Sequence, residues 1–300
     1  MQLLWSIAQV RTPALTYFFQ AVTFLGDEIF LVVLACALYW CVNRETAFGL
    51  CISFFLSALL VQGLKIVVRM DRPWVLDPAF MPVASALKTA TGYSFPSGHT
   101  QSAAAIFGYL GIASGKKKWI VASWALVLLV GFSRMYLGVH TLLDVLGAIA
   151  ISLASILITR ACLKHPRSDA LLPAILLGLS LLVLALALFL HGRSLIETVY
   201  LADCCKAAGG CIGCTAGFLW ARRIPFQTRT PRLWQQVLKL LVGLVVLVGI
   251  KSGLKAIFGE SLALDALRYF LIALWALAVY PLLFMRLYPT ATDAPERENR

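Results

Sequence analysis

Apolar runs close to the length of a membrane span recur along this chain of 300 residues, and they constrain its fold more than any other feature. A helix needs about 20 mostly apolar residues to cross a bilayer. Hydrophobic residues make up 60% of the sequence and charged residues only 13%. The sequence therefore predicts an all-α fold, a polytopic transmembrane helix bundle. Nine spans are expected, near residues 29–43, 47–68, 99–115, 119–138, 141–161, 170–190, 199–220, 237–257 and 262–285.

The same pattern divides the chain into four parts. Residues 1–26 are apolar but lack the basic start and the A-x-A site of a signal peptide, so an interfacial helix is expected there. Residues 27–165 are expected to form a core of five to six helices, and residues 166–287 a four-span extension of unknown role. The tail, residues 288–300, is predicted to be disordered because it combines prolines with mixed charge.

The net charge of +12 reflects an excess of Lys and Arg, and these residues are concentrated in alternate loops. Loops rich in these residues stay in the cytoplasm. The richer set of alternate loops includes Arg44, Lys116, Lys117, Lys118, Arg160, Lys164, Arg167, Arg222, Arg223, Arg232 and Arg286. We therefore expect the opposite helix ends to be extracytoplasmic, in a bacterial inner or plasma membrane. The charge gives no reason to expect a nucleic acid partner, and the sequence does not indicate the oligomeric state.

Four of the eight cysteines cluster in one span, in the stretch DCCKAAGGCIGC of residues 203–214. A metal or redox site would need a partner pair outside the membrane, and no such pair is evident. Close helix packing through small residues is the favoured interpretation. In the same span Asp203 and Lys206 are three residues apart, so they are expected to neutralise each other.

Three polar clusters interrupt the apolar pattern, and the first is LKIVVRMDRPW, residues 64–74. Lys65 and Arg72 are two helical turns apart, so both are expected to project from one face at the end of a span. Pro73 is expected to end that helix. Alternatively, the cluster is a basic flank that reaches toward lipid headgroups.

The second cluster is SFPSGHT, residues 94–100. Ser97 is a good helix N-cap, Gly98 leaves the backbone open to close approach, and His99 adds a titratable donor. The free N–H groups and the positive end of the helix dipole favour an anion there. A helix cap without any function is the alternative.

The third cluster is FSRMYLGVHTLLD, residues 132–144. Arg134 ends one span, whereas His140 and Asp144 open the next and are four residues apart. An ionisable residue inside the bilayer is a functional candidate, and the histidine is its natural partner. The alternative is a polar pair that only stabilises the helix.

Together the clusters predict a site for phosphoryl transfer. Lys65, Arg72 and Arg134 can stabilise the equatorial oxygens of a five-coordinate phosphorus, beside a helix N-terminus and two histidines. No cluster of Asp and Glu suited to Mg²⁺ is evident, so neither a metal nor another cofactor is expected.

The three clusters resemble the three signature motifs of the type 2 phosphatidic acid phosphatase family, which also includes the vanadium haloperoxidases. The resemblance covers residues 27–165. It implies that His140 is the nucleophile, Asp144 its orienting carboxylate and His99 the acid and base. It also implies a set of phosphate ligands, namely Lys65, Arg72, Ser97, Gly98 and Arg134. Thr141 and Leu142 replace the Tyr-Pro that many relatives carry after the nucleophile, and Thr141 is expected to cap the following helix instead.

A site at the boundary of the hydrocarbon suits an amphipathic substrate. We therefore expect an enzyme that hydrolyses a lipid phosphate such as phosphatidate, phosphatidylglycerophosphate, a polyprenyl diphosphate or a sphingoid phosphate, through a phosphohistidine. The alternatives are a phosphotransferase with an alcohol acceptor and a lipid transporter or scaffold without catalysis. A second phosphate groove is a further hypothesis, formed by Lys251, Lys255 and Arg268.

Overall fold

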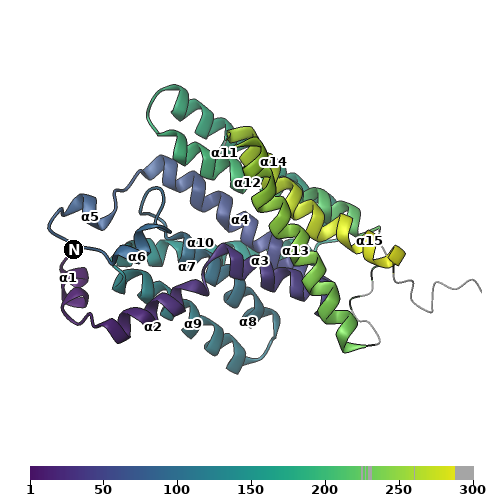
Figure 1. Ribbon diagram of the computed structural model, residues 1–300, viewed down its shortest axis with the longest axis horizontal. Helices are drawn as coiled ribbons and strands as arrows, with labels where there is room; N and C mark the ends of the chain where they lie inside the picture. The colour runs from purple at the N-terminus through teal and green to yellow at the C-terminus, as the bar shows by residue number, and fades with distance from the viewer. Residues whose placement is uncertain (224–225, 227, 229–231, 260, 288–300) are drawn as a thin grey trace, which may run out of the picture.

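The computed structural model describes residues 1–223, 226, 228, 232–259 and 261–287, and within these residues it contains helices and no strand (Figure 1). The predicted disordered tail lies outside the described residues. The elements are α1 Gln2–Gln9, α2 Pro13–Phe24, α3 Glu28–Ala37, η1 Leu38–Val42, α4 Arg44–Val68, α5 Pro73–Leu76, α6 Ala84–Leu87, α7 Gly98–Ala103, η2 Ala104–Gly108, α8 Tyr109–Ala113, α9 Lys117–Tyr136, α10 Leu142–Leu163, α11 Ser168–Gly192, α12 Thr198–Ala221, α13 Leu233–Phe258, α14 Leu262–Leu274, η3 Trp275–Val279 and α15 Tyr280–Leu287.

The predicted all-α membrane bundle is confirmed, but the count of nine spans is not. Six segments of the described chain are long and apolar enough to cross a membrane, namely Arg44–Leu76, α9, α10, α11, α13 and Leu262–Arg286. The pair of α2 with α3 and η1 would make a seventh span, bent by 47°. The segment from α7 to α8 is too short, and α12 contains Asp203, Lys206 and several glycines that lower its hydropathy.

The three polar clusters lie at one end of the bundle. Helices α4 and α9 run toward this end and carry Lys65 and Arg134 in their last turns. Helices α7 and α10 begin there, with Ser97 and Thr141 as their N-caps. In Figure 1 the short helices α5 and α6 lie at the left with the N-terminus, whereas α15 lies at the right. Segments that are distant in sequence therefore meet at a single end.

The end of α4 differs from the prediction. The helix ends at Val68, and Arg69 closes it in the left-handed conformation with φ 52°. Arg72 is the N-cap of the separate helix α5, which begins at Pro73. The prediction that Pro73 ends the long helix, with Lys65 and Arg72 on one helical face, is wrong, because the left-handed residue turns the chain three residues before Arg72.

Close packing of α12 against α14 holds the C-terminal half of the bundle together. A Cβ added at Gly209 would lie 2.1 Å from the carbonyl oxygen of Ala266, and one at Gly213 would lie 2.3 Å from that of Phe270. These glycines, four residues apart, let α14 approach the backbone of α12. The clustered cysteines are free and buried in the same helix, so the prediction of small-residue packing is confirmed. The Asp203–Lys206 pair also forms, at 3.0 Å.

We expect Gly209→Ala to destabilise the protein, because the added methyl group must displace the α14 backbone. Overpacking of this kind typically costs about 1–3 kcal/mol. The control is Gly178→Ala in α11, where an added Cβ meets nothing within 4 Å. Thermal unfolding in detergent should show a lower midpoint for Gly209→Ala only, and equal midpoints would contradict the packing argument.

Candidate active site

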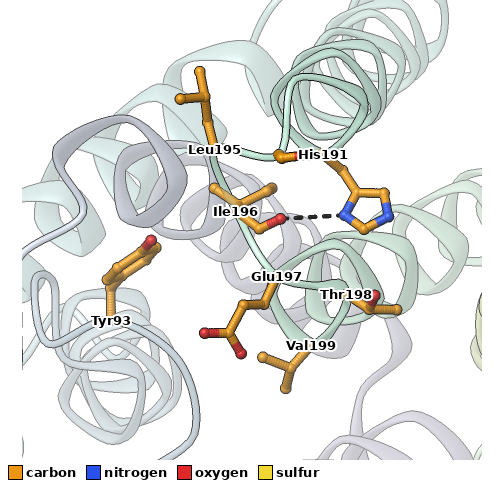
Figure 2. A pocket seen from close by; sticks show the side chains of 8 residues that line it. Tyr93, His191, Leu195, Ile196, Glu197, Thr198 and Val199 are labelled. Carbon is orange, nitrogen blue, oxygen red and sulfur yellow. Dashed lines mark hydrogen bonds between the residues drawn. The ribbon is translucent and has the colours of Figure 1, made fainter.

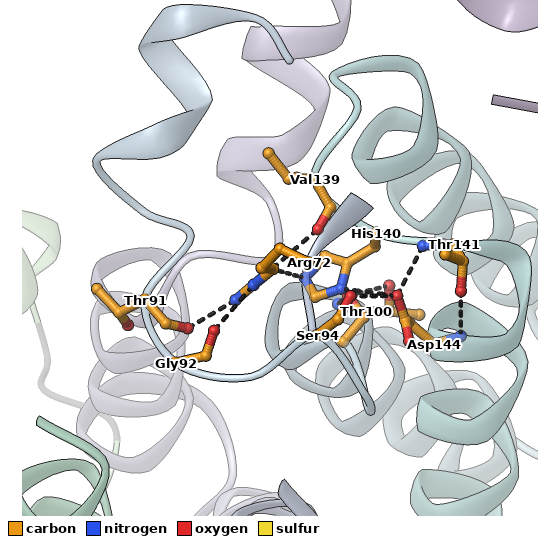
Figure 3. Close-up of polar contacts among 10 residues, drawn as sticks. Arg72, Thr91, Gly92, Ser94, Thr100, Val139, His140, Thr141 and Asp144 are labelled. Carbon is orange, nitrogen blue, oxygen red and sulfur yellow. Dashed lines mark hydrogen bonds and ion pairs between the residues drawn. The ribbon is translucent and has the colours of Figure 1, made fainter. Parts of the chain in front are cut away.

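The start of α10 brings His140 and Asp144 together through a capping box. The Thr141 backbone N–H donates to Asp144 Oδ2 at 2.6 Å, and the Asp144 N–H donates to Thr141 Oγ1 at 3.4 Å. The predicted role of Thr141 as a cap is thus confirmed. His140 precedes the cap, and its Nδ1 lies 3.4 Å from Asp144 Oδ2. The same carboxylate therefore anchors the helix and faces the imidazole (Figure 3).

Ser94, which was not among the predicted site residues, completes the surroundings of this carboxylate. The Ser94 hydroxyl donates to Asp144 Oδ2 at 2.6 Å, and the side chain is fully buried. Its backbone N–H donates to the carbonyl of Met70 at 2.8 Å. Its signal in the sequence was its place just before the PSGH turn, where a buried polar residue needs a partner.

Arg72 fixes the protonation of His140 in this structure. A guanidinium can only donate, so the 3.0 Å contact between Arg72 Nη1 and His140 Nε2 requires a lone pair on Nε2. The proton of the neutral ring then sits on Nδ1, toward Asp144. Arg72 also donates to the backbone carbonyls of Thr91 and Gly92 at 2.6 and 2.9 Å, and to that of Val139 at 2.9 Å (Figure 3).

Arg134 carries the least compensated charge of the cluster. Its side chain is fully buried, and Nη1 donates to the hydroxyl of Thr23 in α2 at 3.0 Å. Its Nε and Nη2 atoms are buried and have no hydrogen-bond partner among the residues that the structure describes. Lys65 is also buried, with 8% of its surface exposed. Buried donors of this kind are costly unless a ligand satisfies them.

The PSGH turn forms the N-terminus of α7 as expected. Ser97 Oγ accepts from the N–H and the hydroxyl of Thr100 at 3.5 and 3.0 Å. A Cβ added at Gly98 would meet nothing within 4 Å, so the backbone there faces open space. His99 is partly exposed beside this space. It lies within electrostatic range of the groups of the other two clusters, namely Lys65, Arg72, Arg134 and His140.

The electrostatics of the cluster favour a neutral His140. Burial and the charges of Arg72, Arg134 and Lys65 lower the pKa of the His140 imidazole well below its usual value. Neutral imidazole is the nucleophilic form. His140 therefore stays neutral over a wider pH range than an exposed histidine.

Two of the three cations expected to form the second phosphate groove are paired with carboxylates. Lys251 is paired with Glu28, and Arg268 with Asp265. These carboxylates offset the charge of Lys251 and Arg268, and the groove stays a prediction. Across the described ranges, no group of three or more His, Cys, Asp or Glu side chains gathers as metal ligands would.

Two family profiles match the chain. The PAP2 superfamily matches residues 46–168, and the transmembrane extension of PAP2 superfamily phosphatases matches residues 205–292. The chain belongs to the PAP2 superfamily. The predictions of this family and of a membrane-bound phosphatase are confirmed.

Relatives of this PAP2 protein are lipid phosphatases. Phosphatidylglycerophosphatase B of Bacillus subtilis is 29% identical over 160 residues, which cover 48% of this chain and 73% of that protein. Human sphingosine-1-phosphate phosphatase 2 is 31% identical over 150 residues, 48% of this chain and 36% of the relative. Undecaprenyl-diphosphatase of Sulfolobus acidocaldarius is 32% identical over 122 residues, 40% and 57% respectively. The match thus spans less than two thirds of the latter two proteins.

A solved structure is also similar. The crystal structure of a transmembrane PAP2 type phosphatidylglycerolphosphate phosphatase from Bacillus subtilis aligns with a TM-score of 0.45 and 25% sequence identity. The alignment covers 53% of this chain and 81% of that chain.

The pH profile of this PAP2 protein should respond to Lys65. Removing this cation in Lys65→Gln raises the pKa of His140, so the neutral form is lost at a higher pH. We expect the acid limb of kcat/KM for phosphate release to move to higher pH than in the wild type. Ionisation of the substrate itself cannot produce this shift, because the substrate is the same.

The control is Lys88→Gln, which removes an exposed cation that is not among the charges acting on His140. Its acid limb should stay in place. A limb that is identical in all three proteins would contradict the electrostatic account.

Proposed function

We propose that this protein hydrolyses the phosphomonoester or diphosphate of a membrane lipid through a phosphohistidine intermediate. His140 is the nucleophile, Asp144 orients it, and His99 is the general acid and base. The phosphate oxygens bind to the cationic side chains and to the PSGH turn, namely to Lys65, Arg72, Arg134, Ser97 and Gly98.

The reaction would proceed in two displacements. In the first, the lone pair of His140 Nε2 attacks phosphorus, the bond from phosphorus to the leaving oxygen breaks, and His99 gives that oxygen a proton. In the second, His99 takes a proton from water, whose oxygen attacks phosphorus and breaks the P–N bond. Inorganic phosphate then leaves, and His140 keeps the Nδ1 proton that faces Asp144 throughout.

The main support is the uncompensated positive charge around His140 Nε2. Arg134 has two buried nitrogens without partners in the described part of the chain, and Arg72 donates to the lone pair that would attack. A bound phosphoryl group would satisfy Arg134 and draw the Arg72 donor away from Nε2. Charged donors fixed in a dry site stabilise the charge that develops in the transition state.

The lipid class and the membrane side are part of the proposal. The site lies where the helices of a membrane bundle end, which suits a phosphate whose tails remain in hydrocarbon. The relatives named above act on lipid phosphates or diphosphates. The opposite helix ends carry the dense basic clusters, such as Lys116–Lys118 before and in α9. The positive-inside rule then favours an extracytoplasmic site.

A screen for phosphate release over lipid phosphates in mixed micelles tests the proposal. The wild type should release phosphate from at least one lipid with EDTA present, and His140→Ala should lower the rate by at least about 10³-fold. Vanadate, which mimics five-coordinate phosphorus, should inhibit. Added glycerol separates hydrolysis from transfer, because a phosphotransferase would form glycerol phosphate. Equal rates for the wild type and His140→Ala would rule out the mechanism.

Gly98→Ala tests the phosphate cradle. The added methyl group meets no atom of the protein, so the fold should be unchanged. It would, however, occupy the space through which a phosphate oxygen approaches the α7 backbone. Losing one hydrogen bond to a charged group corresponds to about a tenfold rise in KM. Gly253→Ala in α13, which is equally unhindered, is the control. An unchanged KM and unchanged vanadate inhibition would place the phosphate elsewhere.

A further inference from the structure

The last turn of α2 contacts the candidate active site, although it lies before the segment that matches the PAP2 superfamily. That match begins at residue 46, whereas α2 spans Pro13–Phe24. Helix α2 packs beside α9, which carries Arg134 in its last turn (Figure 1). Val22 of α2 is buried in one cluster with Ala103 of α7 and Val130 of α9. The N-terminal segment therefore packs against two of the helices that carry predicted site residues.

The turn that follows α2 lies against the backbone of His99. A Cβ added at Gly26 would lie 2.4 Å from the carbonyl oxygen of His99 and 3.1 Å from Cγ1 of Val130. Only a glycine allows so close an approach, so the end of α2 is held tightly against α7 and α9. This packing fixes the place at which Thr23, three residues before Gly26, meets α9.

Thr23 accepts the one hydrogen bond that the Arg134 side chain makes within the described residues. Arg134 Nη1 donates to Thr23 Oγ1 at 3.0 Å, and the arginine is fully buried. The Nε and Nη2 atoms are the ones without a partner there. These two nitrogens form one edge of the planar guanidinium, and such an edge can donate two parallel hydrogen bonds to a phosphate. The contact with Thr23 thus occupies the third nitrogen and leaves this edge for a ligand.

The charge of Arg134 is not balanced by a carboxylate. Among the residues that the structure describes, no ion pair includes this arginine. Asp27 lies within electrostatic range of Arg134, but its Oδ1 accepts the N–H of Ile29 at 2.8 Å as the N-cap of α3. Arg72 is also within range and adds positive charge. A phosphoryl group therefore suits the free edge in charge as well as in geometry.

A separate cavity does not account for these donors. It has a volume of about 660 Å³ and lies between the loop that precedes α7 and the connection from α11 to α12 (Figure 2). Tyr93, His191 and Glu197 are among the residues that line it. None of the described residues in its lining belongs to the three polar clusters. The ligand of Arg134 is therefore not expected in this cavity.

We propose that Thr23 is a positioning residue of the active site, which holds Arg134 so that its Nε–Nη2 edge receives two oxygens of the phosphoryl group. The inference rests on the proposed function, in which Arg134 is a phosphate ligand. Thr23 acts through Arg134 and makes no contact with the phosphate. Without the hydroxyl, Nη1 loses its acceptor, and the guanidinium turns to satisfy that nitrogen instead. The two parallel hydrogen bonds to the phosphoryl group are then misaligned, and the transition state is stabilised less.

Inhibition of phosphate release by vanadate tests this role. Thr23→Val keeps the shape of the side chain but removes the acceptor. We expect the inhibition constant of vanadate to rise about tenfold and kcat/KM to fall by a similar factor, as for the loss of one hydrogen bond to a charged group. Thr23→Ser keeps the hydroxyl and should behave as the wild type does. The control is Thr159→Val in α10, which removes a buried hydroxyl that has no partner in the described residues.

The outcomes separate this inference from the proposed function. If vanadate inhibits Thr23→Val as strongly as the wild type, Thr23 has no positioning role while the lipid phosphatase stands. Equal losses in Thr23→Ser or in Thr159→Val would also overturn the role, because the Thr23 hydroxyl would not be the cause. If the wild type releases phosphate from no lipid phosphate, the proposed function fails and this inference fails with it.

A second variant keeps the test decisive if Thr23→Val does not fold, which thermal unfolding in detergent would show. Thr23→Cys then takes its place, because a thiol is of similar size and accepts hydrogen bonds only weakly. The inhibition constant of vanadate should again rise relative to Thr23→Ser. Equal constants for the cysteine and serine variants would overturn the role of the hydroxyl.

Discussion

The structure depends on positive charge that is buried at one end of a membrane bundle and is not balanced there. Lys65, Arg72 and Arg134 expose 8%, 6% and 0% of their surface. Asp144 is the single buried carboxylate in the described residues. Burying charges without partners costs free energy, and a fold retains them when a ligand of opposite charge repays that cost. Arg72 is partly satisfied by backbone carbonyls, whereas Arg134 donates one hydrogen bond, to the Thr23 hydroxyl, so the charge at this end of the bundle favours an anion.

The extension belongs to the same scaffold. Helix α4 packs against α10 of the core and against α11 and α12 of the extension. The glycines of α12 bring α14 into backbone contact. A shift of the extension would therefore move α4, which carries Lys65, and the loop that holds Arg72. The segments that match the two family profiles pack into one bundle, and both contact the helix that carries Lys65.

Local sequence predicted those parts of the site that depend on short-range geometry. The N-cap at Ser97, the cap at Thr141 and the closeness of His140 to Asp144 follow from spacing along one turn. The link from Ser94 to Asp144 joins residues 50 apart and depends on the fold, so spacing could not reveal it. The course of the chain between Lys65 and Arg72 depends on the left-handed conformation of Arg69. Glycine is the residue that usually indicates such a conformation, so an arginine there gave no sign of the turn. The count of nine spans was not confirmed because the segment from α7 to α8 is shorter than a span and the polar residues and glycines of α12 lower its hydropathy.

In the capping box of α10, one carboxylate makes two different contacts. Asp144 accepts the N–H that starts the helix and faces the imidazole that precedes it. Any change at this position alters the helix terminus and the surroundings of the His140 imidazole at the same time. Thr141, by contrast, contributes only to the start of the helix. A different residue at position 141 thus needs only to start the helix, whereas a different residue at position 144 must also face the imidazole.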